Sequence, residues 1–231
     1  MFQENFHVTI YTMIIDIITI FPDIFKEVFS TSIIGRAVKK GVLAVNIHDL
    51  RKWTKDLHKT VDDKPYGGGA GMLLMLEPIY KALEEIDPER KAYRLLTSPR
   101  GKTLDQKFSR DLSTKERIII ICGHYEGVDQ RVTDFLIDQE ISIGNYVLSG
   151  GELPAMIIVD SVTRLIKDSL GNPDSLDKET FDEETYKEYD QYTRPEVFTT
   201  KDGKELKVPP TLLSGNHQEV EKWKEENAKV K

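Results

Sequence analysis

The sequence has one cysteine, no long apolar run and no excess of basic residues. The lone cysteine, Cys122, excludes a disulfide framework and any zinc site that needs two or more cysteines of one chain. The longest apolar stretches, such as Ile118–Cys122, are far shorter than the roughly 18 residues that span a bilayer. The first basic residue is Lys26, so we expect no signal peptide. These absences predict a soluble, cytoplasmic protein that does not enter a membrane.

Motifs of several common enzyme classes are missing as well. The sequence holds no G-x-G-x-x-G, H-E-x-x-H or G-x-S-x-G. Gly101-Lys102-Thr103 matches the end of a phosphate-binding P-loop, but Leu96 stands where the first glycine would be required. His48 and His58 have no histidine or cysteine near them, which favours surface or capping roles over metal binding. We therefore assign no metal ligands.

The net charge of −7 is concentrated in one segment of the 231 residues. Asn172–Tyr192 carries eight acids and two lysines, hence −6, which leaves −1 for the other 210 residues. A nucleic-acid binder usually has a basic footprint. A dense basic stretch surrounds Trp53 and is interpreted either as a solvated loop or as a local nucleic-acid contact. It consists of Arg51, Lys52, Lys55, His58, Lys59 and Lys64.

Hydrophobic periodicity predicts strands that alternate with helices, which is typical of an α/β fold with a mostly parallel sheet. The expected strands are 14–20, 42–47, 93–96, 117–122 and 139–143. One expected helix opens near Pro22. Further helices are expected over 34–40, 77–86, 104–112, 128–136, 152–167 and 216–229. We divide the chain into an N-terminal extension (1–12), a main domain (13–170), an acidic linker (171–192) and a small helical C-terminal subdomain (193–231).

Three glycine-containing loops follow consecutive expected strands, at 97–101, 123–127 and 142–151. Ligands of open α/β sheets bind at the carboxyl ends of the strands, and glycine lets the backbone approach a ligand closely. Glycine after a strand is also ordinary turn chemistry. The roles of two charged residues are also undecided at this point. Arg164 is suitably spaced for an intrahelical ion pair with Asp160, and Glu179 has the setting of a solvated acid in the linker.

Five runs of the sequence resemble the bacterial tRNA (guanine-N1-)-methyltransferases, in the family's order and spacing. They are Thr60–Met72, Gly123–Arg131, Ile141–Met156, Tyr192–Val197 and Leu212–His217. The resemblance implies a SPOUT-type fold with a deep trefoil knot and a homodimer with active sites between the subunits. It implies methyl transfer from S-adenosylmethionine to N1 of the guanine just 3′ of the tRNA anticodon. It also implies a magnesium requirement, for which no ligand set is visible.

The resemblance further implies roles for individual residues. Arg164 and Glu179 match the family's essential arginine and carboxylate, with Asp177 as an alternative base, and Asp62 and Glu126 match positions near the target guanine. Trp53, Tyr66 and the nearby lysines are candidates to hold the anticodon stem-loop. The residues similar to the family's cofactor site are Pro99, Gly123, Tyr125, Ile143, Gly144, Asn145, Tyr146, Val147, Leu148, Gly150, Gly151 and Pro154.

The sequence departs from the family's usual pattern at several positions. Arginine is usual at three positions that here hold Leu57, Lys59 and His124. Aspartate is usual at two positions that here hold Asn145 and Glu179. These differences keep two alternatives open, namely a SPOUT-like methyltransferase with another target and a non-catalytic RNA-binding protein.

Overall fold

The computed structural model describes residues 13–170, 180 and 186–230. The chain divides into two compact units, Met1–Gly171 and Asn172–Lys231. The first unit contains the main sheet and all three glycine-containing loops, so it positions the candidate site.

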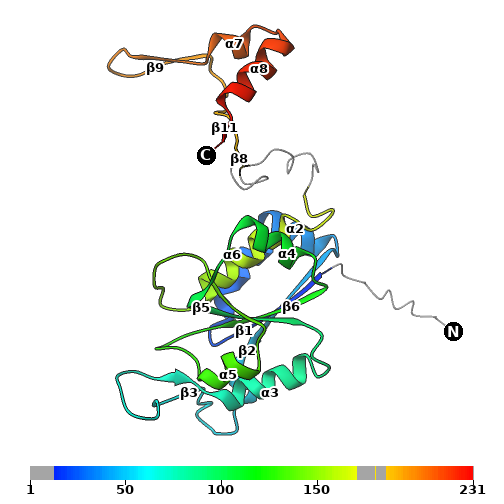
Figure 1. Ribbon diagram of the computed structural model, residues 1–231, viewed down its shortest axis with the longest axis vertical. Helices are drawn as coiled ribbons and strands as arrows, with labels where there is room; N and C mark the ends of the chain where they lie inside the picture. Colours follow the sequence, from blue (N-terminus) through cyan, green and yellow to red (C-terminus); the bar gives the residue numbers. More distant parts are fainter. Residues whose placement is uncertain (1–12, 171–179, 181–185, 231) are drawn as a thin grey trace, which may run out of the picture. The chain divides into compact units, whose positions relative to one another are not determined.

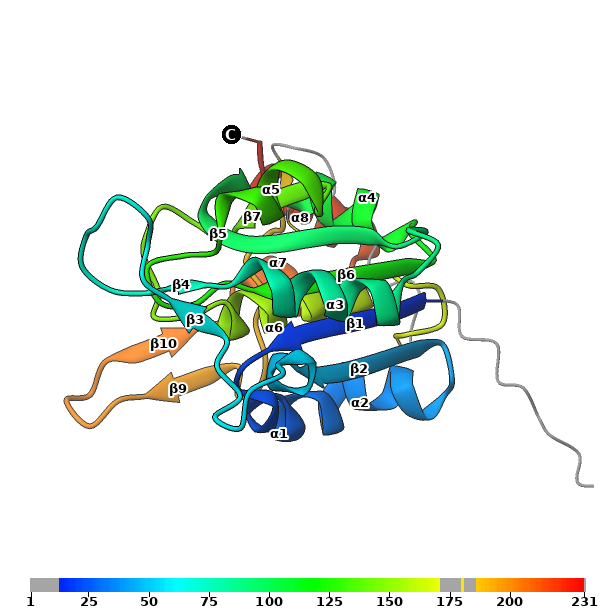
Figure 2. The same ribbon diagram turned by 90° about the horizontal axis from the view of Figure 1, so that it is seen from below.

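A five-stranded parallel sheet in the order β2-β1-β6-β5-β7 forms the centre of the first unit, and most of its strands lie side by side in Figure 2. This arrangement confirms the α/β fold with a mostly parallel sheet; the knot stays a prediction. The strands are β1 (Met13–Thr19), β2 (Leu43–Asp49), β5 (Tyr93–Thr103), β6 (Arg117–Cys122) and β7 (Gln139–Ser142). A small antiparallel pair, β3 (Asp62–Asp63) and β4 (Leu73–Leu74), lies outside this sheet.

Helices cover both faces of the sheet. Helices α2, α4 and α6 pack together on one face, and α3 and α5 lie on the opposite face (Figure 1). The helices are η1 (Pro22–Phe25), α1 (Lys26–Ser30), α2 (Ser32–Lys39), η2 (Leu50–Trp53), α3 (Leu76–Ile86), α4 (Gln106–Ser113), α5 (Gln130–Phe135) and α6 (Glu152–Thr163).

Strand β6 shows why this sequence forms a doubly covered sheet. Its side chains alternate between faces, so Ile118 and Ile120 join the core beside α4 and α6, while Ile119 and Ile121 join the core beside α3 and α5. All four isoleucines are fully buried. Burying one such side chain stabilises a fold by about 1.5–3 kcal/mol, so a run of isoleucines suits a strand covered on both sides.

Three elements differ from the expected bounds for visible reasons. Strand β5 continues to Thr103 through a register shift between Thr97 and Lys102, whereas we expected a loop after Leu96. Helix α4 starts later because Asp105 caps it, accepting a hydrogen bond from the Phe108 N–H at 2.6 Å. Helix α6 ends at Thr163 with Arg164 as its C-cap, and from Leu165 on the backbone bonds shorten to i→i−3.

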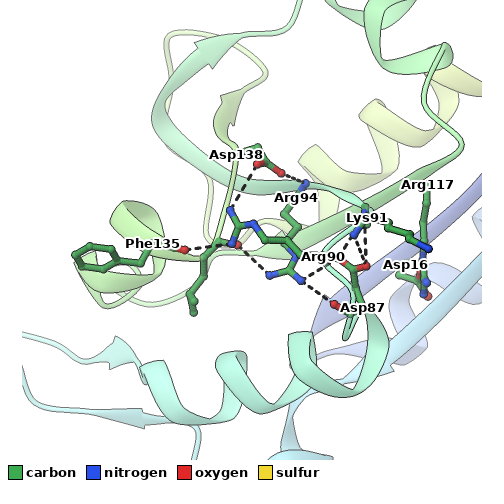
Figure 3. A network of polar contacts seen from close by, with 10 residues as sticks. Asp16, Asp87, Arg90, Lys91, Arg94, Arg117, Phe135 and Asp138 are labelled. Atoms are coloured by element: carbon green, nitrogen blue, oxygen red, sulfur yellow. Dashed lines mark hydrogen bonds and ion pairs between the residues drawn. The ribbon is translucent and has the colours of Figure 1, made fainter.

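Buried ion pairs tie the ends of these elements together, as Figure 3 shows. Arg94 on β5 donates through Nε to the Asp87 carboxylate after α3 (3.0 Å), and its backbone N–H donates to Asp138 before β7 (2.8 Å). On β1, Asp16 accepts from Arg117 Nε (2.9 Å) and Asn46 (3.0 Å) and pairs with His48 (2.8 Å). His48, whose side chain is 23% exposed, thus pairs with a buried carboxylate rather than capping a helix.

The second unit contains more than the single helix we expected. A hairpin of β9 (Val197–Thr199) and β10 (Glu205–Lys207) precedes α7 (Pro210–Leu213) and α8 (His217–Asn227), and β8 (Tyr186–Lys187) pairs with β11 (Lys229–Val230). Trp223 of α8 lies with its ring 6.4 Å from that of Tyr189 and 6.3 Å from that of Tyr192. This aromatic cluster joins α8 to the start of the described second unit.

Candidate active site

A cavity of about 500 Å³ opens at the carboxyl ends of β6 and β7, beside the register shift within β5. Its wall comes from the segment at Thr97–Arg100, the loop at Gly123–Val128 and the loop from Ser142 to Gly151, with Pro154 of α6. This is the edge at which open α/β sheets bind their ligands. The three glycine-containing loops of the sequence therefore surround one cavity.

The loops meet so closely that glycine is required at Gly151. A Cβ atom there would collide with Thr97 Oγ1 and would lie 2.7 Å from the Gly123 nitrogen. Hydrogen bonds hold this contact, because the Gly151 N–H donates to the Gly123 carbonyl (2.8 Å) and the Gly123 N–H donates to Thr97 Oγ1 (3.0 Å). At this point the cavity wall therefore consists of two backbone segments in direct contact.

Ser142 organises the loop that follows β7. Its hydroxyl donates to the Gly144 carbonyl (3.0 Å) and accepts from the Gly144 N–H (3.2 Å). Gly144 has φ +152°, and a Cβ atom there would collide with the Tyr146 ring. The conformation of Gly144 therefore sets where Tyr146 lies in the cavity wall.

The structure brings most of the predicted cofactor residues to this cavity. All of them line it except Gly144 and Asn145, and Glu126 also lines it. The cavity wall also contains Thr97 and Arg100, which belong to the first of the three predicted loops but were not predicted as cofactor residues, and Glu140, which lies outside those loops. Strand periodicity was the available signal for Glu140, because Ile141 points into a core and its neighbours must face the other way. Which of these residues bind a ligand stays a prediction.

Asp62 lies at the rim of the cavity rather than in its wall. Strand β4 pairs with β3 and also bonds to the loop after β6, where the Leu74 N–H donates to the Gly127 carbonyl (3.0 Å). This brings Asp62 to Tyr125. The pKa of Tyr125 is raised, chiefly by burial and then by the charge and hydrogen bond of Asp62. The charge of Arg51 partly offsets this rise. Tyr125 itself has φ +59°, a left-handed conformation that is uncommon for a bulky residue.

Two buried groups beneath the cavity have structural partners. The Glu152 carboxylate, at the start of α6, accepts a hydrogen bond from the Thr19 hydroxyl (2.7 Å). Burial, followed by the nearby Glu152 charge, raises the pKa of the Cys122 thiol well above its usual value. Cys122 is therefore a neutral core residue and a poor nucleophile.

The two predicted catalytic residues are not placed in the cavity by the described structure. Arg164 is the C-cap residue of α6, where its backbone N–H donates to the Asp160 carbonyl (3.2 Å), and it does not line the cavity. Glu179, like the alternative base Asp177, lies outside the described residues.

The basic stretch around Trp53 is partly occupied by contacts within the chain. Trp53 packs against the core beside α3 and donates from Nε1 to Glu85 (2.8 Å). Arg51 donates to the Ile20 carbonyl (2.5 Å), and Lys55 pairs with Glu77 (3.1 Å). These partners favour a structural role for Trp53 and Arg51.

The described part of the chain holds neither a cluster of metal ligands nor a membrane-spanning helix. Within residues 13–170, 180 and 186–230, no group of three or more histidine, cysteine, aspartate or glutamate side chains could hold a metal ion. The helices of the same residues are all too short or too polar to cross a membrane.

The fold and the cavity define an α/β protein with a cavity at the edge of a parallel sheet where such proteins bind their ligands. The sequence model of the family described as tRNA (Guanine-1)-methyltransferase TrmD matches residues 13–231. This chain therefore belongs to the TrmD family of tRNA (guanine-1)-methyltransferases, which are enzymes.

Individual relatives are similar over most of their lengths. The tRNA (guanine-N(1)-)-methyltransferase of Carboxydothermus hydrogenoformans is 45% identical over 94% of this chain and 83% of its own. That of Dictyoglomus turgidum is 49% identical over 93% and 84%. The crystal structure of the tRNA (m1G37) methyltransferase from Aquifex aeolicus superposes with a TM-score of 0.75 at 40% identity, covering 92% of this chain and 87% of that one.

Proposed function

We propose that this protein transfers a methyl group from S-adenosylmethionine to N1 of the guanine immediately 3′ of the anticodon in tRNA. One observation carries the proposal: the runs Gly123–Arg131 and Ile141–Met156, which bear the family resemblance, form much of the wall of a single cavity. Its volume of about 500 Å³ is in the range of small-molecule and cofactor sites.

The chemistry sets the demands on the site. S-adenosylmethionine supplies an activated methyl group on a sulfonium. The guanine N1 loses its proton to a base, attacks the methyl carbon in line, and the carbon–sulfur bond breaks to release S-adenosylhomocysteine. We propose Glu179 as the base, a role that requires hydrogen-bond reach of N1, and Arg164 as the cation that stabilises negative charge developing on the guanine O6.

We propose that Asp62 and Glu126 help to hold the target guanine. Glu126 lies in the cavity wall and Asp62 lies at its rim beside Tyr125. The target base must leave its stack to reach such a cavity. No group among the described residues fits the magnesium ion that the family implies, so no step is assigned to a metal.

A methyl-transfer assay tests the proposed function. The protein is incubated with radiolabelled S-adenosylmethionine and an unmodified tRNA transcript, with a matched transcript that carries adenine 3′ of the anticodon as the control. We expect label in the first transcript and none in the second. Equal labelling would indicate another target, and RNA binding without transfer would indicate a non-catalytic protein.

We expect Gly144→Val to weaken S-adenosylmethionine binding about ten- to hundredfold, because valine at φ +152° costs about 1–3 kcal/mol and collides with Tyr146. Calorimetry measures the affinity, and a thermal melt checks that the fold is kept. Gly203→Val is a matched control, since Gly203 also has a positive φ but has open space around its Cβ position. Equal affinity of both variants and the parent would place the cofactor elsewhere.

We also propose that the protein is a homodimer that uses an exposed apolar stripe of α6. Leu153 and Ile157, one helical turn apart, are 52% and 45% exposed, while their helix neighbours are mostly buried. Helix α6 contacts η1, which contains the exposed Ile24 and directly follows the exposed Phe21. Exposed apolar patches of this kind mark interaction sites.

The dimer prediction is tested with Ile157→Glu. A buried, unpaired charge at the interface should convert a dimer into monomers at micromolar concentration and reduce methyl transfer accordingly. Sedimentation velocity measures the change. Tyr80→Glu on α3 introduces the same charge at a similarly exposed position and should leave the assembly intact. A parent protein that is fully active as a monomer would contradict the dimer.

A further inference from the structure

The cavity contains a polar atom that lacks a hydrogen-bond partner. Glu140 lines the cavity from β7, and its side chain is 19% exposed. Its Oε1 atom is shut off from solvent and accepts no hydrogen bond within the described part of the chain. A buried carboxylate oxygen without a donor is costly, so Glu140 is suited to a ligand that displaces the atoms covering Oε1 and donates to the carboxylate in their place.

The nearest charge is that of Arg100, which also lines the cavity. Its Nη2 lies 3.5 Å from Glu140 Oε1, which is close enough for electrostatic attraction but beyond good hydrogen-bond geometry. The Arg100 side chain is itself largely exposed. The backbones beside the two residues are packed together, because Gly101 lies so close to the Glu140 carbonyl that a Cβ there would be only 2.7 Å from it. The cavity therefore presents a carboxylate and a guanidinium side by side.

Resting on the proposed function, we infer that Glu140 and Arg100 recognise the amino-acid end of S-adenosylmethionine. Glu140 accepts hydrogen bonds from the α-ammonium group, and Arg100 binds the adjacent α-carboxylate. The amino-acid end carries opposite charges on neighbouring groups, as the pair does. Its ammonium offers N–H donors to the Glu140 carboxylate, with a compensating charge, once the Arg100 side chain turns to the α-carboxylate.

Other parts of the cofactor match this pair less well. The sulfonium is positive but has no N–H or O–H to donate. The adenine and ribose have donors but no positive charge to balance a carboxylate. The pair would therefore select ligands that carry the amino-acid end, whether the sulfur is methylated or not.

Calorimetry with four ligands tests this inference on the full chain. The ligands are S-adenosylmethionine, S-adenosylhomocysteine, 5′-methylthioadenosine and adenosine, and only the first two carry the amino-acid end. We expect Glu140→Gln to weaken the first two about ten- to hundredfold, as for a lost charge-assisted hydrogen bond, and to leave the other two unchanged. Arg100→Gln should give the same pattern. The double variant should lose less than the product of the two single losses, because the two side chains act on one group.

Glu226→Gln is the matched control, because Glu226 forms an exposed pair with Lys222 at 3.7 Å outside the cavity. It should bind all four ligands like the parent. Thermal melts of every variant check the fold, and Arg100→Gln keeps the test valid if Glu140→Gln does not fold.

Three results would overturn the inference. Unchanged affinities in both single variants would leave the pair without a role in binding. An equal loss for 5′-methylthioadenosine, in a variant with a normal melt, would place the pair at the nucleoside. A loss for S-adenosylmethionine but not for S-adenosylhomocysteine would mean that the carboxylate recognises the sulfonium. A parent protein that binds none of the four ligands would instead contradict the proposed function.

Discussion

Replacing Glu179 with glutamine should slow single-turnover methyl transfer about 10²–10⁴-fold, the range typical of a positioned general base. Glutamine keeps the size of the side chain and its capacity for hydrogen bonding, but it cannot take the proton from guanine N1. The affinity for S-adenosylmethionine should stay nearly unchanged, since the base acts on the other reactant. Quenched-flow assays with enzyme in excess over tRNA measure the chemical step itself.

Asp177→Asn is the control for this experiment, because Asp177 lies two residues away on the same acidic segment. It should transfer methyl groups at nearly the parental rate. Slow methyl transfer by the Asp177 variant together with fast transfer by the Glu179 variant would assign the role of base to Asp177 and leave the mechanism intact. Fast transfer by both variants would exclude a carboxylate base on this segment.

Asp16→Asn should lower the free energy of unfolding at pH 7 by about 3 kcal/mol. Breaking a buried ion pair typically costs about 3–5 kcal/mol, and the low end applies because the Arg117 side chain stays partly in water. Asp16 is 1% exposed, so its carboxylate depends on Arg117, drawn near it in Figure 3, and on Asn46 and His48 from β2. Urea unfolding of the parent and the variant measures the difference.

The effect of Asp16 should depend on pH in a defined direction. Burial opposes ionisation, but hydrogen bonds from His48, Asn46 and Arg117 outweigh it and hold the pKa of Asp16 below its usual value. A carboxylate with a lowered folded pKa stabilises the fold above its unfolded pKa, and this contribution is lost as the pH falls through the folded pKa. The difference between parent and variant should therefore narrow below about pH 4.

Asp56→Asn is the control for the pH dependence. Hydrogen bonds from Thr60 lower the pKa of Asp56, but its side chain is exposed, so the variant should change stability far less than Asp16→Asn does. A gap between the parent and Asp16→Asn that stays constant from pH 7 to pH 3 would show that Asp16 acts through packing rather than through its charge.

The strands and helices of the first unit were largely predictable because their patterns are local. Strand β6 has the bounds expected from the run of isoleucines, and α3 ends at Ile86 as expected. The continuation of β5 beyond Leu96 was not predictable, since Pro99 and Gly101 are typical of a turn and only pairing with β7 keeps this segment extended. The β9–β10 hairpin did leave a signal, because Asp202-Gly203 between short apolar segments is typical of a hairpin turn, although we expected only a helix in this subdomain.

The site was predictable in part for the same reason. The three loops follow strands of a parallel sheet, so they were expected to meet at one edge of it. The alternation of strands with helices along the sequence already indicates such a sheet. The contact of Asp62 with Tyr125 depends on β4 bonding to both β3 and the loop after β6, and no local pattern encodes such a junction. Glu140 could not be recognised as unpaired from sequence, because the absence of a donor is a property of the packed cavity.

The crowding at Gly123 and Gly151 limits how this site can diverge. Because a side chain at either position would run into the backbone or side chain of a neighbouring loop, substitutions there cannot retune ligand preference gradually. Changes in specificity must instead arise at positions whose side chains have room, such as Val147, which is 81% exposed in the cavity wall. Homologous sequences that bind altered ligands should accordingly keep the glycine framework and vary around it.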